Sequence, residues 1–338
     1  MLERYNKILI FNNQGIGDLV HMLPLLEQVR LNFPESFVTI ILRTNEQKQL
    51  LRPGLVNEVI LLGELDSRKI KRIRSDKYDL GIMNVITNKI KGYVFLKYFL
   101  SCRCVLSEFY YAGKNRRHIW VKKDDSIHRV ERNARLAEAL CGKFNVICPK
   151  FEKVDIDVSE KRKLIGICVG AYETSFDYRF RRYKKSIKQW PLENLLSFLN
   201  ILVTENYVPV LIGGTKEKSI IDAIDNSLRE KCIDLIGKTD MKSTIGWLSK
   251  CEAVVGSDTG IIHIASALGI KTIGLYGPTP PNQFRPYGAN GYYIESEYKC
   301  RYCYGDSKRM YNCKENACMK AISPQVVFGK LEEILVAQ

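Results

Sequence analysis

An apolar strand that leads directly into a helix decides the fold class, at residues 255–269, which read VGSDTGIIHIASALG. Asp258 stands where a helix N-cap belongs. The free N–H groups of Thr259 and Gly260, together with the positive end of the helix, would then form a site for a diphosphate. His263 follows Thr259 by four residues, so both side chains would share one helix face, where His263 could donate to a phosphate oxygen. The alternative is that Asp258 only caps the helix and that His263 is an interior histidine.

Short β-rich runs alternate with amphipathic helical stretches on both sides of this segment. Such βαβα alternation is typical of parallel sheets covered by helices, and 338 residues suffice for two α/β domains of ordinary size. A charged stretch with few strand residues leads to residue 163, so we predict one domain over 1–155 and a second over 156–338. The last helical pattern, near 324–337, could pack back across either domain. The β-rich runs are 7–12, 37–43, 58–62, 78–84, 164–170, 208–213, 232–236, 253–256 and 272–276.

Composition places the chain among compact globular proteins, with 46% hydrophobic and 26% charged residues. No apolar run reaches the roughly 20 residues that a membrane-spanning helix needs. The N-terminus resembles no secretion signal, so we expect a cytoplasmic protein. Lys and Arg exceed Asp and Glu by 52 to 37, a formal charge of +15. This charge favours anionic partners such as nucleic acid, an acidic membrane surface or a phosphorylated glycan.

A second strand ends in a Gly/Pro-rich turn at residues 273–281, which read IGLYGPTPP. The run from Asp258 to Pro281 resembles the signature of glycosyltransferase family 9, the heptosyltransferases of bacterial lipopolysaccharide and related surface glycans. The resemblance implies the GT-B fold, in which two Rossmann-like domains with parallel sheets face a central cleft. It also implies transfer of a heptose from ADP-heptose. Three further segments match the family in order, so the resemblance covers most of the chain.

The first of these segments joins the first strand to the first helix at residues 13–18, NQGIGD. Gly15 and Gly17 allow a tight turn and could contact acceptor or phosphate. In similar proteins the matching Asp is the candidate general base, which identifies Asp18 as the residue that takes the acceptor hydroxyl proton. The alternative is that Asp18 only caps a helix that begins at Leu19.

The second segment reads KQWP at residues 188–191 and resembles the family's lysine-containing motif ahead of a helix. A lysine there can neutralise the diphosphate as the sugar leaves, so Lys188 is the second catalytic candidate. Residues 178–185 before it are strongly basic. Arg179 and Arg182 in this run could contact donor or acceptor phosphate, although a charge run is usually a solvated face.

The third segment ends a strand with two glycines and then an acidic residue, at 211–217, LIGGTKE. Such an acid is expected beside a nucleotide ribose in the family. Gly214 and Glu217 are therefore candidate nucleotide-binding residues, and Glu217 could accept hydrogen bonds from the ribose hydroxyls.

Four of the eleven cysteines crowd into one region, with the spacing C-x2-C-x9-C-x4-C. Four thiolates with one CxxC pair could hold a structural Fe or Zn ion, and some relatives are thought to carry iron in such a finger. The spacing is not that of a standard zinc ribbon, so free thiols are the alternative. The residues are Cys300, Cys303, Cys313 and Cys318.

Taken together, we predict an inverting glycosyltransferase without a catalytic cofactor. Its N-terminal domain would bind a phosphorylated or lipid-linked glycan acceptor, such as the lipopolysaccharide core, and its C-terminal domain the nucleotide sugar. The acceptor could bring the protein to the inner face of the cytoplasmic membrane.

Three alternatives stay open: a heptosyltransferase acting on a protein, a nucleotide-sugar epimerase of GT-B shape, and a basic protein that binds nucleotide or nucleic acid. Nucleic acid is not the expected partner, because no nucleic-acid-binding motif is found. A dinucleotide dehydrogenase is disfavoured because G-x-G-x-x-G does not follow the first strand.

Overall fold

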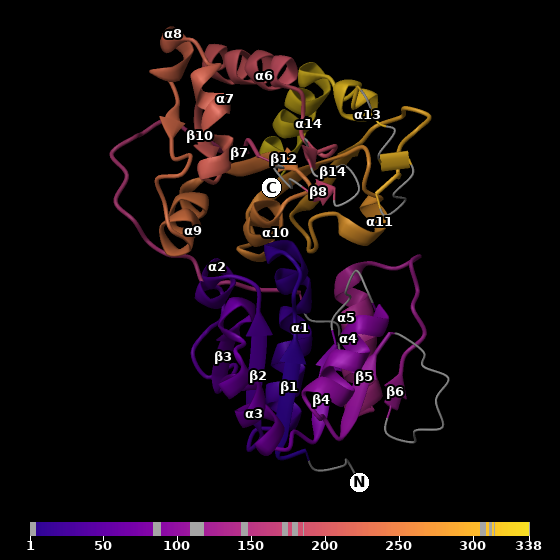
Figure 1. Cartoon of the computed structure of the whole chain (residues 1–338). Coiled ribbons are helices and arrows are strands. Elements are labelled where there is room, and N and C mark those ends of the chain that lie inside the picture. Colours follow the sequence, from indigo (N-terminus) through magenta and orange to yellow (C-terminus); the bar gives the residue numbers. More distant parts are fainter. Residues whose placement is uncertain are drawn as a thin grey trace. The chain divides into compact units, whose positions relative to one another are not determined.

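The chain forms two units, Met1–Pro149 and Lys150–Gln338, in a computed structural model. The structure describes residues 5–83, 89–108, 118–142, 148–170, 175–177, 182–184, 186–304, 309–310, 313 and 315–337. Figure 1 colours the first unit from indigo to magenta and the second onward to yellow. The sequence predicted the division a few residues later, after residue 155.

The first unit is a parallel sheet flanked by helices. Its described strands pair in the order β3-β2-β1-β4-β5-β6. They are β1 (Lys7–Phe11), β2 (Phe37–Leu42), β3 (Glu58–Leu61), β4 (Leu80–Met83), β5 (Cys104–Ser107) and β6 (His118–Trp120). The helices are α1 (Ile16–Asn32), α2 (Asn45–Gln49), η1 (Leu62–Glu64), α3 (Ser67–Ser75), α4 (Lys89–Val94), η2 (Phe95–Phe99) and α5 (Arg129–Cys141).

The second unit repeats this plan, with the order β11-β10-β7-β12-β13-β14. Its strands are β7 (Leu164–Cys168), β10 (Val208–Ile212), β11 (Ile233–Asp234), β12 (Ala253–Ser257), β13 (Lys271–Tyr276) and β14 (Gly291–Glu295), and β8 (Ser175–Asp177) pairs with β9 (Arg182–Lys184) as a separate ribbon. Its helices are α6 (Leu192–Thr204), η3 (Thr215–Glu217), α7 (Lys218–Asp222), α8 (Asn226–Arg229), α9 (Met241–Lys250), α10 (Gly260–Ala267), α11 (Pro281–Phe284), α13 (Ala317–Lys320) and α14 (Pro324–Val336).

Both sheets therefore share one strand order, in which the first strand of each unit lies at the centre and the order reverses beside it. This order confirms the predicted α/β fold of two Rossmann-like units. In such sheets ligands bind at the carboxyl ends of the strands, where the order reverses. The relevant strands are β1 with β4 in the first unit, and β7 with β12 in the second.

The last helix, α14, packs within its own unit. It contacts α6 and β13, and Val327, Leu331 and Ile334 on it are buried. The Lys271 ammonium on β13 donates to the carbonyls of Ile334 and Ala337, which ties the end of the helix to the sheet. The sequence left open which unit this helix packs against. In the structure its apolar face packs against the second unit. Among the described residues, no helix combines the length and apolar character required to cross a bilayer.

Candidate functional site

A pocket of about 210 Å³ opens at the carboxyl ends of β7, β10 and β12, where the strand order of the second unit reverses. It gathers residues that were predicted from separate motifs: the catalytic candidate Lys188 and the nucleotide-binding candidates Gly214, Glu217, Asp258, Thr259 and Gly260. Its lining residues are Cys168, Gly170, Lys188, Ile212, Gly213, Gly214, Glu217, Asp258, Thr259, Gly260 and Ile261. This position is where parallel α/β sheets bind ligands.

Lys188 and Asp258 form an ion pair in the wall of the pocket. The Lys188 Nζ lies 2.9 Å from Asp258 Oδ2, and the two side chains are 11% and 5% exposed. Burial disfavours the ionised carboxylate, but the Lys188 ammonium and the contact with His263 outweigh it, so the pKa of Asp258 lies well below its ordinary value. The pair therefore presents one fixed cation to the pocket, with its carboxylate partner ionised.

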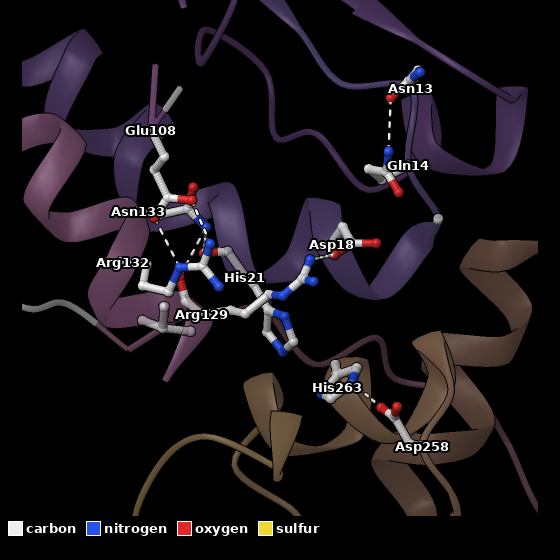
Figure 2. Close-up of polar contacts among 12 residues, drawn as sticks. Asn13, Gln14, Asp18, His21, Glu108, Arg129, Arg132, Asn133, Asp258 and His263 are labelled. Atoms are coloured by element: carbon white, nitrogen blue, oxygen red, sulfur yellow. Dashed lines mark hydrogen bonds and ion pairs between the residues drawn. The ribbon is translucent and has the colours of Figure 1, made fainter. Parts of the chain in front are cut away.

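His263 contacts the other oxygen of the same carboxylate. Its Nε2 lies 3.1 Å from Asp258 Oδ1, and the ring is buried (Figure 2). The described residues that line the pocket do not include His263. His263 therefore contacts the same carboxylate that pairs with Lys188, and its donation to a phosphate oxygen stays a prediction.

The start of α10 differs from the prediction. The helix begins at Gly260, and its N-cap is Thr259, whose side chain makes no capping hydrogen bond. The carboxylate of Asp258 is directed to Lys188 and His263 instead of capping the helix. The positive end of α10 thus faces the pocket through Thr259, Gly260 and Ile261, which line it.

Glu217 closes the side of the pocket next to β10. Its Oε2 accepts a hydrogen bond of 2.8 Å from the backbone N–H of Gly214, and the residue is buried. A Cβ on Gly170 would lie 2.5 Å from the Glu217 side chain, and one on Gly213 would lie 3.3 Å from its Cβ. A Cβ on Gly170 would therefore displace the Glu217 carboxylate from this position, whereas one on Gly213 would make only a tight contact.

Asp18 lies in the first turn of α1, directly after β1 in the first unit. The helix begins at Ile16 with Gly15 as its N-cap, so Asp18 is inside the helix and not its cap. The preceding turn is held by the Gln47 amide, which donates to the carbonyls of Gln14 and Gly15. Gly15 has φ −74° and open space where a Cβ would lie, so neither backbone strain nor packing explains a glycine there. The predicted conformational reason for Gly15 is wrong.

Arg129, which the sequence analysis missed, is the partner of Asp18. It stands at the start of α5, and its Nη1 donates to Asp18 Oδ1 at 2.5 Å, with both side chains partly buried (Figure 2). The two residues are 111 positions apart, and nothing in the local pattern of either one signals the contact. Only the packing of α5 against α1 brings them together.

Polar contacts fix α5 in this position. The guanidinium of Arg132, which is buried, forms an ion pair with Glu108 at the end of β5. Asn133 Nδ2 donates to the backbone carbonyl of His21 on α1, as Figure 2 also shows. Buried polar groups need such partners, so these contacts define how α5 sits on α1 and where Arg129 points.

Two predicted phosphate contacts cannot be assigned. Arg179 lies outside the described residues, and Arg182 is described only as part of strand β9, not for its side chain. Gly17 lies in the first turn of α1, next to Asp18. Its contact with acceptor or phosphate stays a prediction.

The cysteine cluster is partly buried: Cys303 and Cys318 are buried, Cys313 is intermediate and Cys300 is exposed. Burial first, and then the neighbouring thiols, raise the pKa of Cys318 to about 12. The four cysteines are thus near neighbours. Within the described part of the chain, however, no group of three or more His, Cys, Asp or Glu side chains is arranged to hold a metal ion. The structure gives the predicted Fe or Zn site no support.

Comparison with solved structures bears out the fold. The chain is similar to a structure of E. coli ADP-heptose lps heptosyltransferase II, with a TM-score of 0.73, 21% identity and 98% of each chain covered. It is also similar to a family 9 glycosyltransferase from Veillonella parvula, with a TM-score of 0.70, 18% identity, 100% of this chain and 99% of that one. The predicted GT-B fold class is confirmed.

Comparison of sequences gives the family. The chain is 27% identical to a lipooligosaccharide heptosyltransferase 2 of Haemophilus influenzae, over 82% of this chain and 85% of that protein. The model of glycosyltransferase family 9 (heptosyltransferase) matches residues 68–314, which is most of the chain. The chain therefore belongs to glycosyltransferase family 9, and it is a glycosyltransferase.

Proposed function

We propose that the protein transfers a heptose from ADP-heptose onto an acceptor of the lipopolysaccharide or lipooligosaccharide core, with inversion at the anomeric carbon. The family supports the reaction class, and the names of the relatives support the donor and the acceptor. The observation that carries the proposal is the Lys188–Asp258 ion pair in the wall of a pocket at the strand-order reversal.

The donor side of the proposal rests on the charges around this pocket. The diphosphate would lie against the N-terminus of α10, where the N–H groups of Gly260 and Ile261 and the helix dipole favour an anion. Lys188 would stand beside the bridging oxygen that takes up charge when the sugar leaves. Glu217 already accepts one backbone hydrogen bond, and its carboxylate would accept from the ribose hydroxyls.

The acceptor side rests on Asp18. An acceptor hydroxyl oxygen attacks C1 of the heptose, the C1–oxygen bond to the diphosphate breaks with its electron pair, and the hydroxyl proton passes to the Asp18 carboxylate. The Arg129 guanidinium orients this carboxylate through the ion pair. The protein forms no covalent bond to the sugar in this scheme, and ADP departs with the charge that Lys188 offsets.

The experiment is a calorimetric titration of the protein with ADP, UDP, GDP and ADP-heptose, followed by a transfer assay with core acceptors. We expect selective binding of ADP and ADP-heptose, lost in Asp258→Ala and weakened in Lys188→Ala. Asp18→Asn is the matched control, because it should bind ADP like the wild type while transfer stops. Failure of the wild type to bind any of the four nucleotides would refute the donor site.

A lipid-linked acceptor would bring the enzyme to the cytoplasmic face of the inner membrane. The formal charge of +15 supports attraction to anionic lipid at that surface. Co-sedimentation with vesicles of phosphatidylglycerol, at low and at high salt, tests this part of the proposal. Salt-sensitive binding is expected, and no binding at low salt would contradict it.

A structural Fe or Zn ion at the four cysteines stays a prediction of the sequence. Elemental analysis of the purified protein decides it. A stoichiometric metal that is lost in Cys300→Ser and Cys313→Ser would establish the site, and a metal-free, fully folded and active protein would rule it out.

A further inference from the structure

We infer that Tyr304, at the edge of the cysteine-rich segment, is a positioning residue for Lys188. The Lys188 ammonium lies over the Tyr304 ring, 4.0 Å from the ring centroid. The same ammonium forms the ion pair with Asp258. This inference rests on the proposed function, because it assigns a residue that prepares Lys188 for the donor diphosphate.

The backbone around Tyr304 is anchored to the loop that follows β13. The Tyr302 N–H donates to the carbonyl of Gly277 at 2.9 Å, and the Tyr304 N–H donates to the carbonyl of Pro278 at 2.8 Å. The ring of Phe284 meets the Tyr304 ring edge to face, with 6.2 Å between the centroids. Two backbone hydrogen bonds and one ring contact therefore define where the Tyr304 ring lies.

The cysteines help to hold the same loop. A Cβ on Gly277 would lie only 2.8 Å from the Cys318 Sγ, so the buried Cys318 thiol packs directly on the residue that accepts from Tyr302. Cys303, also buried, precedes Tyr304 in the chain. This packing links the cysteine segment to the donor pocket through Tyr304, without a role for the thiols in the chemistry.

A lysine needs such support because its four-carbon chain carries a compact charge on several rotatable bonds. An aromatic face attracts the ammonium and, when the site is shielded from water, contributes more than it does at an exposed surface. Lys188 is largely shielded, at 11% exposure. Lys188 is among the described residues that line the pocket and Tyr304 is not, so the role inferred for Tyr304 is exerted through Lys188.

Two variants of Tyr304 test the inference, with a third as control. Tyr304→Leu removes the aromatic face, Tyr304→Phe retains it, and Tyr298→Leu changes an exposed tyrosine of the same segment. We expect Tyr304→Leu to weaken ADP binding and raise the donor KM by roughly fivefold to thirtyfold, the range of a shielded cation–π contact. Tyr304→Phe and Tyr298→Leu should bind ADP as the wild type does. Wild-type affinity in Tyr304→Leu would overturn the positioning role.

A double-mutant cycle measures the contact itself without any nucleotide. Unfolding by urea is compared for the wild type, Tyr304→Leu, Lys188→Met and the double variant, since residues in contact give non-additive effects. We expect the folding equilibrium constant of the double variant to be at least fivefold larger than the value obtained by adding the free-energy changes of the two single variants. Additive effects would overturn the inference. If the wild type binds no nucleotide, the proposed function fails, and this cycle still decides whether Tyr304 holds Lys188.

Discussion

Replacement of Lys188 by Met should destabilise the second unit through the carboxylate that it leaves behind. The change keeps an unbranched apolar chain but removes the ammonium that lies 2.9 Å from Asp258. Asp258 is 5% exposed and, among the residues that the structure describes, would keep His263 as its one polar side-chain partner. Removal of one partner of a buried ion pair costs roughly 3–5 kcal/mol, and the 11% exposure of Lys188 favours the lower end, about 3 kcal/mol.

The loss is large enough to measure by thermal or urea unfolding. For a unit of this size, about 3 kcal/mol corresponds to a fall in Tm of roughly 6–12 °C. The fluorescence of Trp190 and Trp247, both in the second unit, reports its unfolding. The matched control is the double variant Lys188→Met/Asp258→Asn. We expect it to recover more than half of the loss, because the buried charge is gone.

The loss should also depend on pH in a defined direction. In the wild type the pKa of Asp258 is lowered, so the stabilisation from the ionised carboxylate is present above the unfolded value of about 3.9 and is lost only at more acidic pH. In Lys188→Met the main cause of the lowering is absent, while burial still raises the pKa. The folded variant then takes up a proton more readily than the unfolded chain does. The difference in unfolding free energy should shrink from pH 7 to pH 4, and a loss under about 1 kcal/mol or one independent of pH would refute the reasoning.

Three further outcomes follow from the geometry. Asp18→Asn should lower kcat by about 10² to 10⁴ in a transfer assay, whereas a drop of less than tenfold would exclude a general base. Gly170→Ala should cost about 1–3 kcal/mol in thermal unfolding, because its Cβ would lie 2.5 Å from a carboxylate side chain, while Gly15→Ala meets open space and should stay within about 0.5 kcal/mol. At pH 7.5 iodoacetamide should modify the exposed Cys300 well before Cys318, whose pKa burial raises to about 12, and equal rates in peptide mass spectrometry would contradict that burial.

Strands with long apolar runs were predictable, and so were the short edge strands β3 and β11, whereas β5, β6 and β14 were not. Residues 253–256 and 272–276 appear as β12 and β13, because a central parallel strand is buried on both faces and reads as a continuous apolar run. Strand β6, His118–Trp120, has three residues and none of them is buried. Its extended conformation is stabilised by parallel pairing with β5, which its own three residues do not predict.

The site shows the same division. Lys188 was found from a motif ahead of a helix, and Glu217 and Asp258 were found from motifs that follow a strand. Parallel strands bring their carboxyl ends to one edge of the sheet, where the pocket that these residues line opens. Their contacts were not found. Asp258 was expected to cap α10, since a local N-cap is the usual role of an Asp before a helix. In the folded unit its carboxylate instead contacts Lys188 and His263.

The sequence by itself determined the two α/β units, the strand ends that carry the site, and the family to which the enzyme belongs. These follow from apolar runs and motifs that each span a few residues and can be read without knowing how the rest of the chain folds. Only the tertiary structure decided which side chains meet: Lys188 with Asp258 across 70 residues, and Asp18 with Arg129 across 111. The physical reason is that a charged side chain takes the partner that packing brings within hydrogen-bond distance, and no local pattern records that distance.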